Sequence, residues 1–223
     1  MISIAIDGPA GAGKSTISRL AAEKLGYIYV DTGALYRAVG LKFSLLGYDT
    51  SLDCDVAGVL AGTSVDIRFI NGDQRVFLDG NDVSDDIRTP AASMMASAVS
   101  ARREVREFLL EMQRRLAREN NVVMDGRDIG TVVLPDATVK IYLTASAEER
   151  AGRRWRELVG KGEKITFKEV YDDIVKRDYN DMHREIAPLK KAEDAVLADT
   201  TGRTLEESAE LVLKIVAERK EKN

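Results

Sequence analysis

The feature that constrains this chain most is a glycine-rich stretch near its start. It reads Gly-Pro-Ala-Gly-Ala-Gly-Lys-Ser-Thr over residues 8–16. The apolar residues at 2–6 favour a strand before it, and residues 17–25 favour a helix after it. Strand, glycine-rich loop and helix in this order are the context that a phosphate-binding loop requires.

The spacing within this stretch predicts that it binds a nucleoside triphosphate. Glycine lacks the Cβ that would block the backbone amides from turning toward a phosphate. Lys14 follows the last glycine, where its ammonium reaches the β- and γ-phosphates, and the Ser15 hydroxyl is placed to ligate Mg²⁺. The positive end of the following helix adds to this attraction. The expected binding residues are Gly8, Pro9, Ala10, Gly11, Ala12, Gly13, Lys14, Ser15 and Thr16. The alternative is a tight turn that happens to be rich in glycine, but both the motif and its flanking elements favour phosphate binding.

The overall composition favours one α/β domain. The 223 residues are 44% hydrophobic, which is enough to bury a substantial core. A net charge of −4 argues against a surface that coats nucleic acid, because such surfaces need clustered positive charge. The single cysteine, Cys54, cannot form an internal disulfide, and the start of the chain does not resemble a signal peptide. No apolar stretch approaches the roughly 20 residues that span a bilayer. We expect a soluble, cytoplasmic protein, a monomer, with no nucleic-acid or membrane partner.

Beyond the loop, strand-like and helix-like segments alternate. The expected strands cover residues 27–30, 121–124, 138–143 and 195–198, and the expected helices cover residues 35–46, 91–101 and 102–119. Three more helices begin at Ser146, Thr166 and Thr204, each completed as a capping box by a glutamate three residues later. This order predicts an α/β fold of the P-loop NTPase class, with a parallel sheet flanked by helices.

Two segments depart from that alternation. Residues 64–80 alternate apolar and polar side chains around Asn71-Gly72-Asp73, which predicts a β-hairpin in a small separate lobe. Gly160-Lys161-Gly162 separates an arginine-dense helix from the helix at Thr166, so this pair is a candidate lid. Within a single domain of residues 1–223, we assign residues 1–36, 102–148 and 189–223 to the core, 37–101 to the hairpin lobe and 149–188 to the lid.

Periodicity also assigns particular side chains to the core or to solvent. Leu45 is expected on the apolar side of the helix at 35–46, and Met94 and Met95 are expected to fill gaps in the core. His183, the only histidine, is expected at the surface rather than as a catalytic base. The charged residues 218–223 are expected to form a frayed end.

Charged residues follow two of the expected strands. Asp125 ends the strand at 121–124, where an acid can hold Mg²⁺ beside Ser15, and Arg127 and Asp128 extend into the same strand mouth. A charged surface turn is the alternative for this cluster, and its location at a sheet edge favours function. Arg37 follows the strand at 27–30; it faces either a substrate or solvent, and its position alone does not decide between them.

The helix that starts at Thr166 carries an unusual stripe. Its apolar positions, Phe167, Val170 and Ile174, continue at helical spacing into the charged residues Arg177, Asp181 and Arg184. Because burying unpaired charge is costly, these side chains either fray into solvent or line a polar cleft that an anion completes. We favour the cleft.

A phosphate-binding loop occurs in kinases, motors and nucleotide-dependent switches, so it does not decide the activity by itself. The Asn-Lys-x-Asp segment expected of a guanine-specific switch is absent from the sequence. Arginines near strand ends and in a hinged helical pair are instead what phosphoryl transfer between two anionic nucleotides requires.

Four motifs together resemble the bacterial cytidylate kinases. They are the stretch at 8–16, Asp-Thr-Gly-Ala-Leu-Tyr-Arg at 31–37, Asp-Gly-Arg-Asp-Ile-Gly-Thr-Val-Val at 125–133 and Arg-Asp-Tyr-Asn-Asp-Met-His-Arg at 177–184. The resemblance covers nearly the whole chain and includes the hairpin, which is typical of that family's monophosphate-binding lobe. It implies transfer of the γ-phosphoryl group of ATP to CMP or dCMP with Mg²⁺.

The resemblance also implies roles for individual residues. Ser97, Arg106 and Asp128 resemble the residues that read the cytosine base, and Asp181 resembles the residue that holds the ribose, with Arg177 nearby. Lys14 is the donor-side catalytic group, and Arg37, Arg127 and Arg184 resemble the arginines around the acceptor phosphate. Thr32 stands where some relatives have serine, and Arg150 and Arg154 resemble ATP-side lid arginines.

Two other activities stay open beside this one. A kinase for another nucleoside monophosphate would use UMP, dTMP or AMP at least as well as CMP. A non-catalytic switch would bind ATP, form no CDP, and have no need of the charged stripe at Arg177, Asp181 and Arg184.

Overall fold

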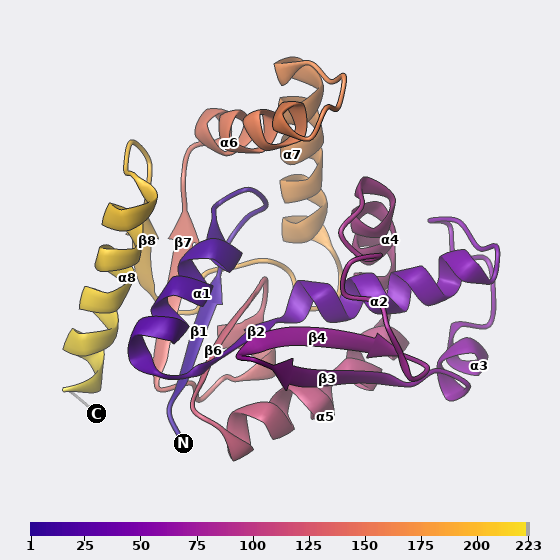
Figure 1. The fold of residues 1–223 in the computed structure, drawn as a ribbon, viewed down its shortest axis with the longest axis horizontal. Coiled ribbons are helices and arrows are strands. Elements are labelled where there is room, and N and C mark those ends of the chain that lie inside the picture. Colours follow the sequence, from indigo (N-terminus) through magenta and orange to yellow (C-terminus); the bar gives the residue numbers. More distant parts are fainter. Residues whose placement is uncertain (222–223) are drawn as a thin grey trace.

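The computed structural model describes residues 1–221 and centres on a parallel sheet of five strands in the order β2-β6-β1-β7-β8 (Figure 1). The strands are β1 (Ser3–Asp7), β2 (Ile28–Asp31), β6 (Val122–Gly126), β7 (Val139–Thr144) and β8 (Val196–Asp199). All four neighbouring pairs run parallel, so the carboxyl ends of the strands meet at one edge. This confirms the predicted fold class.

Helices cover both faces of this sheet, which explains why its strands are apolar on both sides. Ile4 and Ile6 pack with α1 (Lys14–Leu25) and α8 (Leu205–Lys220) in one buried cluster. Ala5, whose side chain points the other way, packs with α5 (Arg103–Glu119) in a second cluster. The first helix ends at Gly26, as predicted, in a left-handed conformation with φ of 67°.

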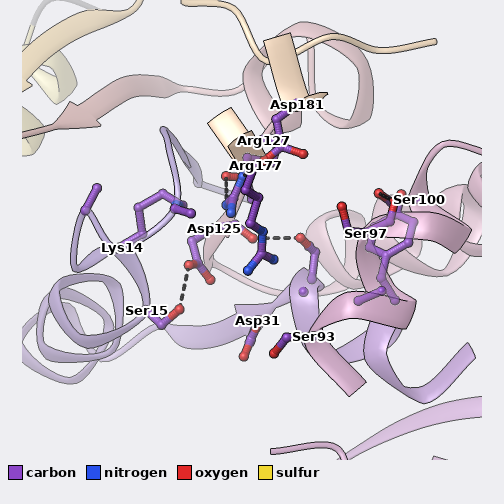
Figure 2. A pocket seen from close by; sticks show the side chains of 18 of the residues that line it. Lys14, Ser15, Asp31, Ser93, Ser97, Ser100, Asp125, Arg127, Arg177 and Asp181 are labelled. Atoms are coloured by element: carbon purple, nitrogen blue, oxygen red, sulfur yellow. Dashed lines mark hydrogen bonds and ion pairs between the residues drawn. The ribbon is translucent and has the colours of Figure 1, made fainter. Parts of the chain in front are cut away.

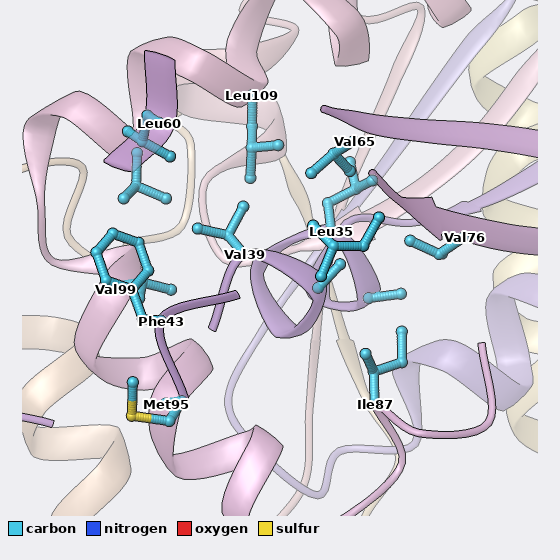
Figure 3. Packing of buried hydrophobic residues seen from close by; sticks show 14 of the residues in the cluster. Leu35, Val39, Phe43, Leu60, Val65, Val76, Ile87, Met95, Val99 and Leu109 are labelled. Atoms are coloured by element: carbon cyan, nitrogen blue, oxygen red, sulfur yellow. The ribbon is translucent and has the colours of Figure 1, made fainter. Parts of the chain in front are cut away.

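The insert after the second strand packs against α2 (Thr32–Leu45). It contains α3 (Val56–Ala61), the hairpin β3 (Val65–Ile70) and β4 (Asp73–Leu78), the short strand β5 (Asn81–Asp82), and α4 (Pro90–Ser100). The hairpin was predicted, whereas α3 and β5 were not. Figure 3 shows the shared core, in which Leu35, Val39 and Phe43 of α2 lie among side chains of the hairpin, α4 and α5.

The remaining elements extend from the carboxyl edge of the sheet. The two helices of the candidate lid are α6 (Ala147–Gly160) and α7 (Phe167–His183), joined by a short loop; they lie above the sheet edge and opposite α4 (Figure 1). A π-helix, η1 (Ile129–Val133), follows β6 after Arg127 and Asp128. No helix in residues 1–221 is long and apolar enough to cross a membrane.

Three predicted core positions are wrong. Leu45 is 71% exposed because it lies in the last turn of α2, beyond the packed part. Met94 is 60% exposed although Met95 is buried. The two helices are closest where Met95 of α4 meets Gly40 of α2, since a Cβ at Gly40 would lie only 2.9 Å from the Met95 Cβ. Met94 therefore points away from α2. Phe167, in the first turn of α7, is 42% exposed.

Two predictions about helix ends also need correction. The capping boxes at Thr166 and Thr204 are complete, but at Ser146 only half forms, because the Glu149 carboxylate accepts from Arg153 and from the Gly202 amide instead. The end predicted to fray at 218–223 is helical through Lys220; residues 222–223 lie outside the described part of the chain.

Candidate active site

A cleft opens at the carboxyl edge of the sheet, between the phosphate loop, α4 and α7. Figure 2 shows Lys14 and Ser15 at one end of it, Ser97 and Ser100 at the other, and Arg127 and Arg177 between them. The predicted site residues that line the cleft are Ala10 to Thr16, Thr32, Arg37, Ser97, Asp125, Arg127, Asp128, Arg154, Arg177, Asp181 and Arg184. Residues 31–37, 125–128 and 177–184 therefore meet around one cavity.

The loop has the geometry of an anion cradle. Gly8 has φ of 153°, and a Cβ there would lie 1.9 Å from the Leu143 carbonyl oxygen, so only glycine fits. Gly13 has φ of 82° and forms the N-cap of α1. The Lys14 ammonium donates to the Pro9 carbonyl at 2.8 Å. Burial, followed by the charge of Arg127, lowers the pKa of Lys14 to about 7. A phosphate in the loop would offset that unfavourable burial of charge.

A hydroxyl and a carboxylate suited to a divalent cation lie beside the loop. The Ser15 hydroxyl donates to Asp125 Oδ2 at 3.0 Å, and the Tyr29 hydroxyl donates to Asp125 Oδ1 at 3.0 Å. Burial and the nearby Asp31 raise the pKa of Asp125 to about 6, which shows that its negative charge is poorly compensated. Mg²⁺ binds through one or two carboxylates together with substrate phosphates, so Ser15 and Asp125 fit this ion.

The far end of the cleft holds a buried carboxylate between two arginines. Asp128 is 4% exposed and accepts hydrogen bonds from Arg106 and, at 3.3 Å, from Arg184. The Arg106 guanidinium also lies over the Tyr36 ring, 5.6 Å from its centroid. Buried charges need such partners, so these side chains form a fixed polar wall.

Further arginines line the middle of the cleft. Arg127 donates to Asp181 at 2.8 Å and Arg37 donates to Asp31 at 2.9 Å. The Nε atoms of Arg37 and Arg177 are buried and have no hydrogen-bond partner within residues 1–221. Burial and the charge of Arg127 lower the pKa of Arg177. Unsatisfied guanidinium groups that face a cavity are suited to an anionic ligand.

Two residues predicted to bind nucleotide, Thr32 and Arg150, make their hydrogen bonds within the protein. The Thr32 hydroxyl donates to the Asp125 carbonyl at 2.7 Å, so it fixes the end of β6. Arg150 is not part of the cleft lining; its side chain is 7% exposed and pairs with Asp178 at 2.6 Å. Arg150 also donates to the Ala10 and Ala145 carbonyls, both at 2.9 Å. The structure thus places Arg150 behind the phosphate loop, whereas Arg154 faces the cleft.

The chain is similar to known proteins over nearly its whole length. A model of the family described as cytidylate kinase matches residues 4–218.

The chain belongs to the cytidylate kinase family.

Relatives named cytidylate kinase are similar to the chain throughout. The one from Caldicellulosiruptor saccharolyticus is 54% identical over 96% of this chain and 95% of that protein. The one from Carboxydothermus hydrogenoformans is 51% identical over 97% of each chain.

Solved structures are similar in fold. A gluconokinase from Sinorhizobium meliloti aligns with a TM-score of 0.50 and 17% identity, covering 99% of this chain and 94% of that one. An uncharacterized protein from Eubacterium ventriosum aligns with a TM-score of 0.54 and 13% identity, covering 97% of this chain and 98% of that one.

Three acidic residues of this family member escaped the sequence analysis. Asp31, the first residue of the motif at 31–37, caps α2 by accepting from the Ala34 amide and pairs with Arg37. Asp178 is buried and accepts from the Ala10 amide at 3.2 Å. Asp7 is buried and accepts from the Ile129 and Gly130 amides. Asp7 and Asp31 end strands, and Asp178 lies four residues after Ile174 and three before Asp181 on the buried face of α7, so each position carried a signal.

Proposed function

We propose that this protein transfers the γ-phosphoryl group of ATP to CMP or dCMP, giving ADP and CDP or dCDP. The observation that carries the proposal is the combination, in one cleft, of a phosphate loop with a buried carboxylate held between two arginines, in a member of the cytidylate kinase family. Both ends of the cleft have the chemistry that a phosphoryl donor and a cytosine nucleotide require.

We place ATP at the phosphate loop. The loop amides from Gly11 to Thr16 and the Lys14 ammonium surround its β- and γ-phosphates. Ser15 and Asp125 hold Mg²⁺, which when bound neutralises charge on the phosphates and orients them. Arg154, which lies in the cleft wall, approaches the same phosphates from the lid.

We place CMP at the opposite end. Arg37, Arg127 and Arg184 surround its phosphate, with Arg177 nearby, and Asp181 holds the ribose. These assignments are supported by the meeting of all five side chains in the cleft lining. The two guanidinium groups whose Nε atoms have no partner within residues 1–221 support an anion at this point.

We assign cytosine recognition to Ser97, Arg106 and Asp128. Cytosine presents acceptors at O2 and N3 and a donor at the N4 amino group, which an arginine and a carboxylate complement. Uracil has a carbonyl in place of that amino group, so it would face the Asp128 carboxylate with no donor between them. An unpaired buried acceptor costs roughly 1–3 kcal/mol, so UMP should be used less well.

The reaction needs little covalent help from the protein. A phosphate oxygen of CMP attacks the γ-phosphorus of ATP while the bond to the bridging β–γ oxygen breaks, and ADP carries that oxygen away. No general base is needed, because the acceptor phosphate is already anionic near neutral pH. The arginines hold the two phosphates in line, and closure of the lid at 149–188 over the lobe at 37–101 would exclude water.

We also propose that the protein works as a monomer in the cytoplasm and engages nucleotides rather than nucleic acid. The net charge of −4 supports the absence of a nucleic-acid surface. A partly buried, unpaired Cys54 is compatible with a reducing compartment.

The deciding assay measures diphosphate formation from ATP and Mg²⁺ with CMP, dCMP, UMP, dTMP and AMP as acceptors. We expect CDP and dCDP as the main products, with UMP used roughly 5- to 150-fold less efficiently, which corresponds to about 1–3 kcal/mol. Equal or better use of another monophosphate would favour a different nucleoside monophosphate kinase. ATP binding without any diphosphate product would favour a nucleotide-dependent switch.

A further inference from the structure

Asp7 is a buried carboxylate for which the proposed reaction has no role. It is the last residue of β1, where the register pairs it with Gly126 of β6, and it is 5% exposed. Its Oδ1 accepts from the Ile129 amide at 2.8 Å, and its Oδ2 accepts from the Gly130 amide at 2.7 Å. Both amides lie in the first turn of η1, immediately after Asp128.

The side chain expected to cap the first turn of η1 is that of Asp128. Asp128 is the N-cap residue of η1, and an aspartate at an N-cap usually accepts from the amides of its own helix. Asp31 and Asp55 do so in this chain, accepting from the Ala34 and Gly58 amides at 3.0 Å. Asp128 makes no such bond within the described residues.

The Asp128 carboxylate points the other way instead. It is bonded to Arg184, which lines the cleft, and to Arg106, which is not part of the cleft lining. Both carboxylate oxygens are engaged there, Oδ2 by Arg106 and Oδ1 by Arg184. Asp7, which reaches η1 from the neighbouring strand, satisfies the Ile129 and Gly130 amides, and the Gly130 amide is at a position from which an N-cap side chain can accept.

We infer that Asp7 is a positioning residue that caps η1 in place of Asp128 and so keeps the Asp128 carboxylate available for the acceptor base. This rests on the proposed function, since it deepens the assignment of Asp128 to cytosine recognition. Asp7 touches neither nucleotide; it sets acceptor selectivity through Asp128.

Other contacts hold η1 in place, so what Asp7 controls is the orientation of the Asp128 side chain. Arg114 of α5 already holds the other end of η1, donating to the Val132 and Val133 carbonyls at 3.0 Å. On the near side, a Cβ at Gly130 would lie 3.2 Å from Lys140 and 3.4 Å from Asp7 Oδ2, so the turn is tightly enclosed. Loss of Asp7 therefore leaves η1 in place with two uncapped amides beside Asp128, which can rotate to accept from them.

The first test compares Asp7→Asn and Asp7→Ala with the wild-type protein. Asparagine keeps the volume but offers only one acceptor, so one η1 amide is left unpaired. We expect the ratio of kcat/KM for CMP to kcat/KM for UMP to fall about tenfold in both variants, chiefly through a higher KM for CMP, as expected when a group that contacts substrate is misplaced. The KM for ATP should stay at the wild-type value.

Asp55→Asn is the control for loss of a helix cap, because Asp55, the exposed N-cap residue of α3, also accepts from a helix amide but lies outside the cleft lining. It should leave the CMP-to-UMP ratio unchanged. Circular dichroism and thermal unfolding show whether each variant is folded. Asparagine keeps the volume of the Asp7 side chain and one of its two acceptors, so Asp7→Asn is expected to fold.

A double-mutant cycle with Asp128→Asn separates this role from a merely structural one. If Asp7 acts through Asp128, then Asp7→Asn changes the CMP-to-UMP ratio in the wild type but not further in the Asp128→Asn background. Additive changes in the two backgrounds, or an unchanged ratio in both Asp7 variants, would overturn the inference. A wild-type protein that forms no CDP would instead overturn the proposed function, so the two failures are distinguishable.

Discussion

The buried ion pair between Arg150 and Asp178 should tie the lid helices to the phosphate loop. Arg150 lies on α6 and Asp178 on α7, with side chains 7% and 12% exposed. Together they bind both backbone polar groups of one loop residue: Asp178 accepts from the Ala10 amide at 3.2 Å and Arg150 donates to the Ala10 carbonyl at 2.9 Å. Removal of either side chain leaves its partner buried without a counter-charge.

The expected cost follows from that burial. Removing one member of a buried ion pair typically lowers the free energy of unfolding by about 3–5 kcal/mol, because the remaining charge is uncompensated. We expect losses of this size for Asp178→Asn and Arg150→Met. If the two side chains acted independently, the double variant would lose about 6–10 kcal/mol, the sum of the single losses. We expect it to lose no more than one single variant, because no unpaired charge is left.

Urea unfolding, followed by circular dichroism, measures the four free energies of this cycle. The fluorescence of Trp155, the only tryptophan, provides a local probe, since its indole donates to the Ile165 carbonyl beside the lid hinge. Additive losses in the double variant would refute the coupling. Steady-state kinetics then distinguish an Arg150 that holds the loop through the ion pair from an Arg150 that binds an ATP phosphate, the role expected from the sequence. If the ion pair holds the loop, Asp178→Asn raises the KM for ATP as much as Arg150→Met does. If Arg150 binds a phosphate, only Arg150→Met raises it.

Three further predictions concern the cleft. Arg184→Ala should raise the KM for CMP while ATP affinity, measured by calorimetry, stays near the wild-type value; an equal loss of ATP binding would place Arg184 at the wrong end. Ser15→Ala should weaken Mg²⁺-dependent activity, and excess chelator should abolish wild-type turnover; turnover that persists in chelator would contradict the metal assignment. Asp7 titrates with a pKa raised from 3.8 to about 6 by burial, so its stabilising contribution is complete below pH 3.8 and is lost as the pH rises through 6. At about 1.4 kcal/mol per pKa unit, the difference in unfolding free energy between Asp7→Asn and the wild type should shift by about 2.4 kcal/mol in favour of the variant between pH 4 and 7, and a constant difference in urea titrations would contradict it.

Local patterns predicted most of the fold because each element carries its own signal. Periodicity located the strands and helices to within a few residues, and the capping boxes at Thr166 and Thr204 are both complete. What periodicity could not supply is the extent of packing along a helix. Leu45 and Met94 are apolar and helical, yet α2 extends beyond its neighbours at Leu45, and α4 approaches α2 at Gly40 through Met95 rather than Met94.

The site was predictable where motifs lie at strand ends, and was missed where partners come from distant segments. Parallel strands bring residues 31–37 and 125–128 to one edge, so their meeting followed from the fold class. The hydrogen bonds of Asp7 to η1 join residues more than 120 positions apart, and the bond of Asp178 to Ala10 joins residues 168 positions apart. Such pairings depend on strand register and helix docking, which no single segment encodes.

The most direct test of the two-ended cleft is a crystal structure of the protein with CMP bound. The account predicts that the pyrimidine N4 amino group lies within hydrogen-bonding distance of Asp128, with Arg106 at the same edge of the ring and the phosphate among Arg37, Arg127 and Arg184. A pyrimidine ring bound away from Asp128 and Arg106 would contradict the account, whatever the phosphate loop holds.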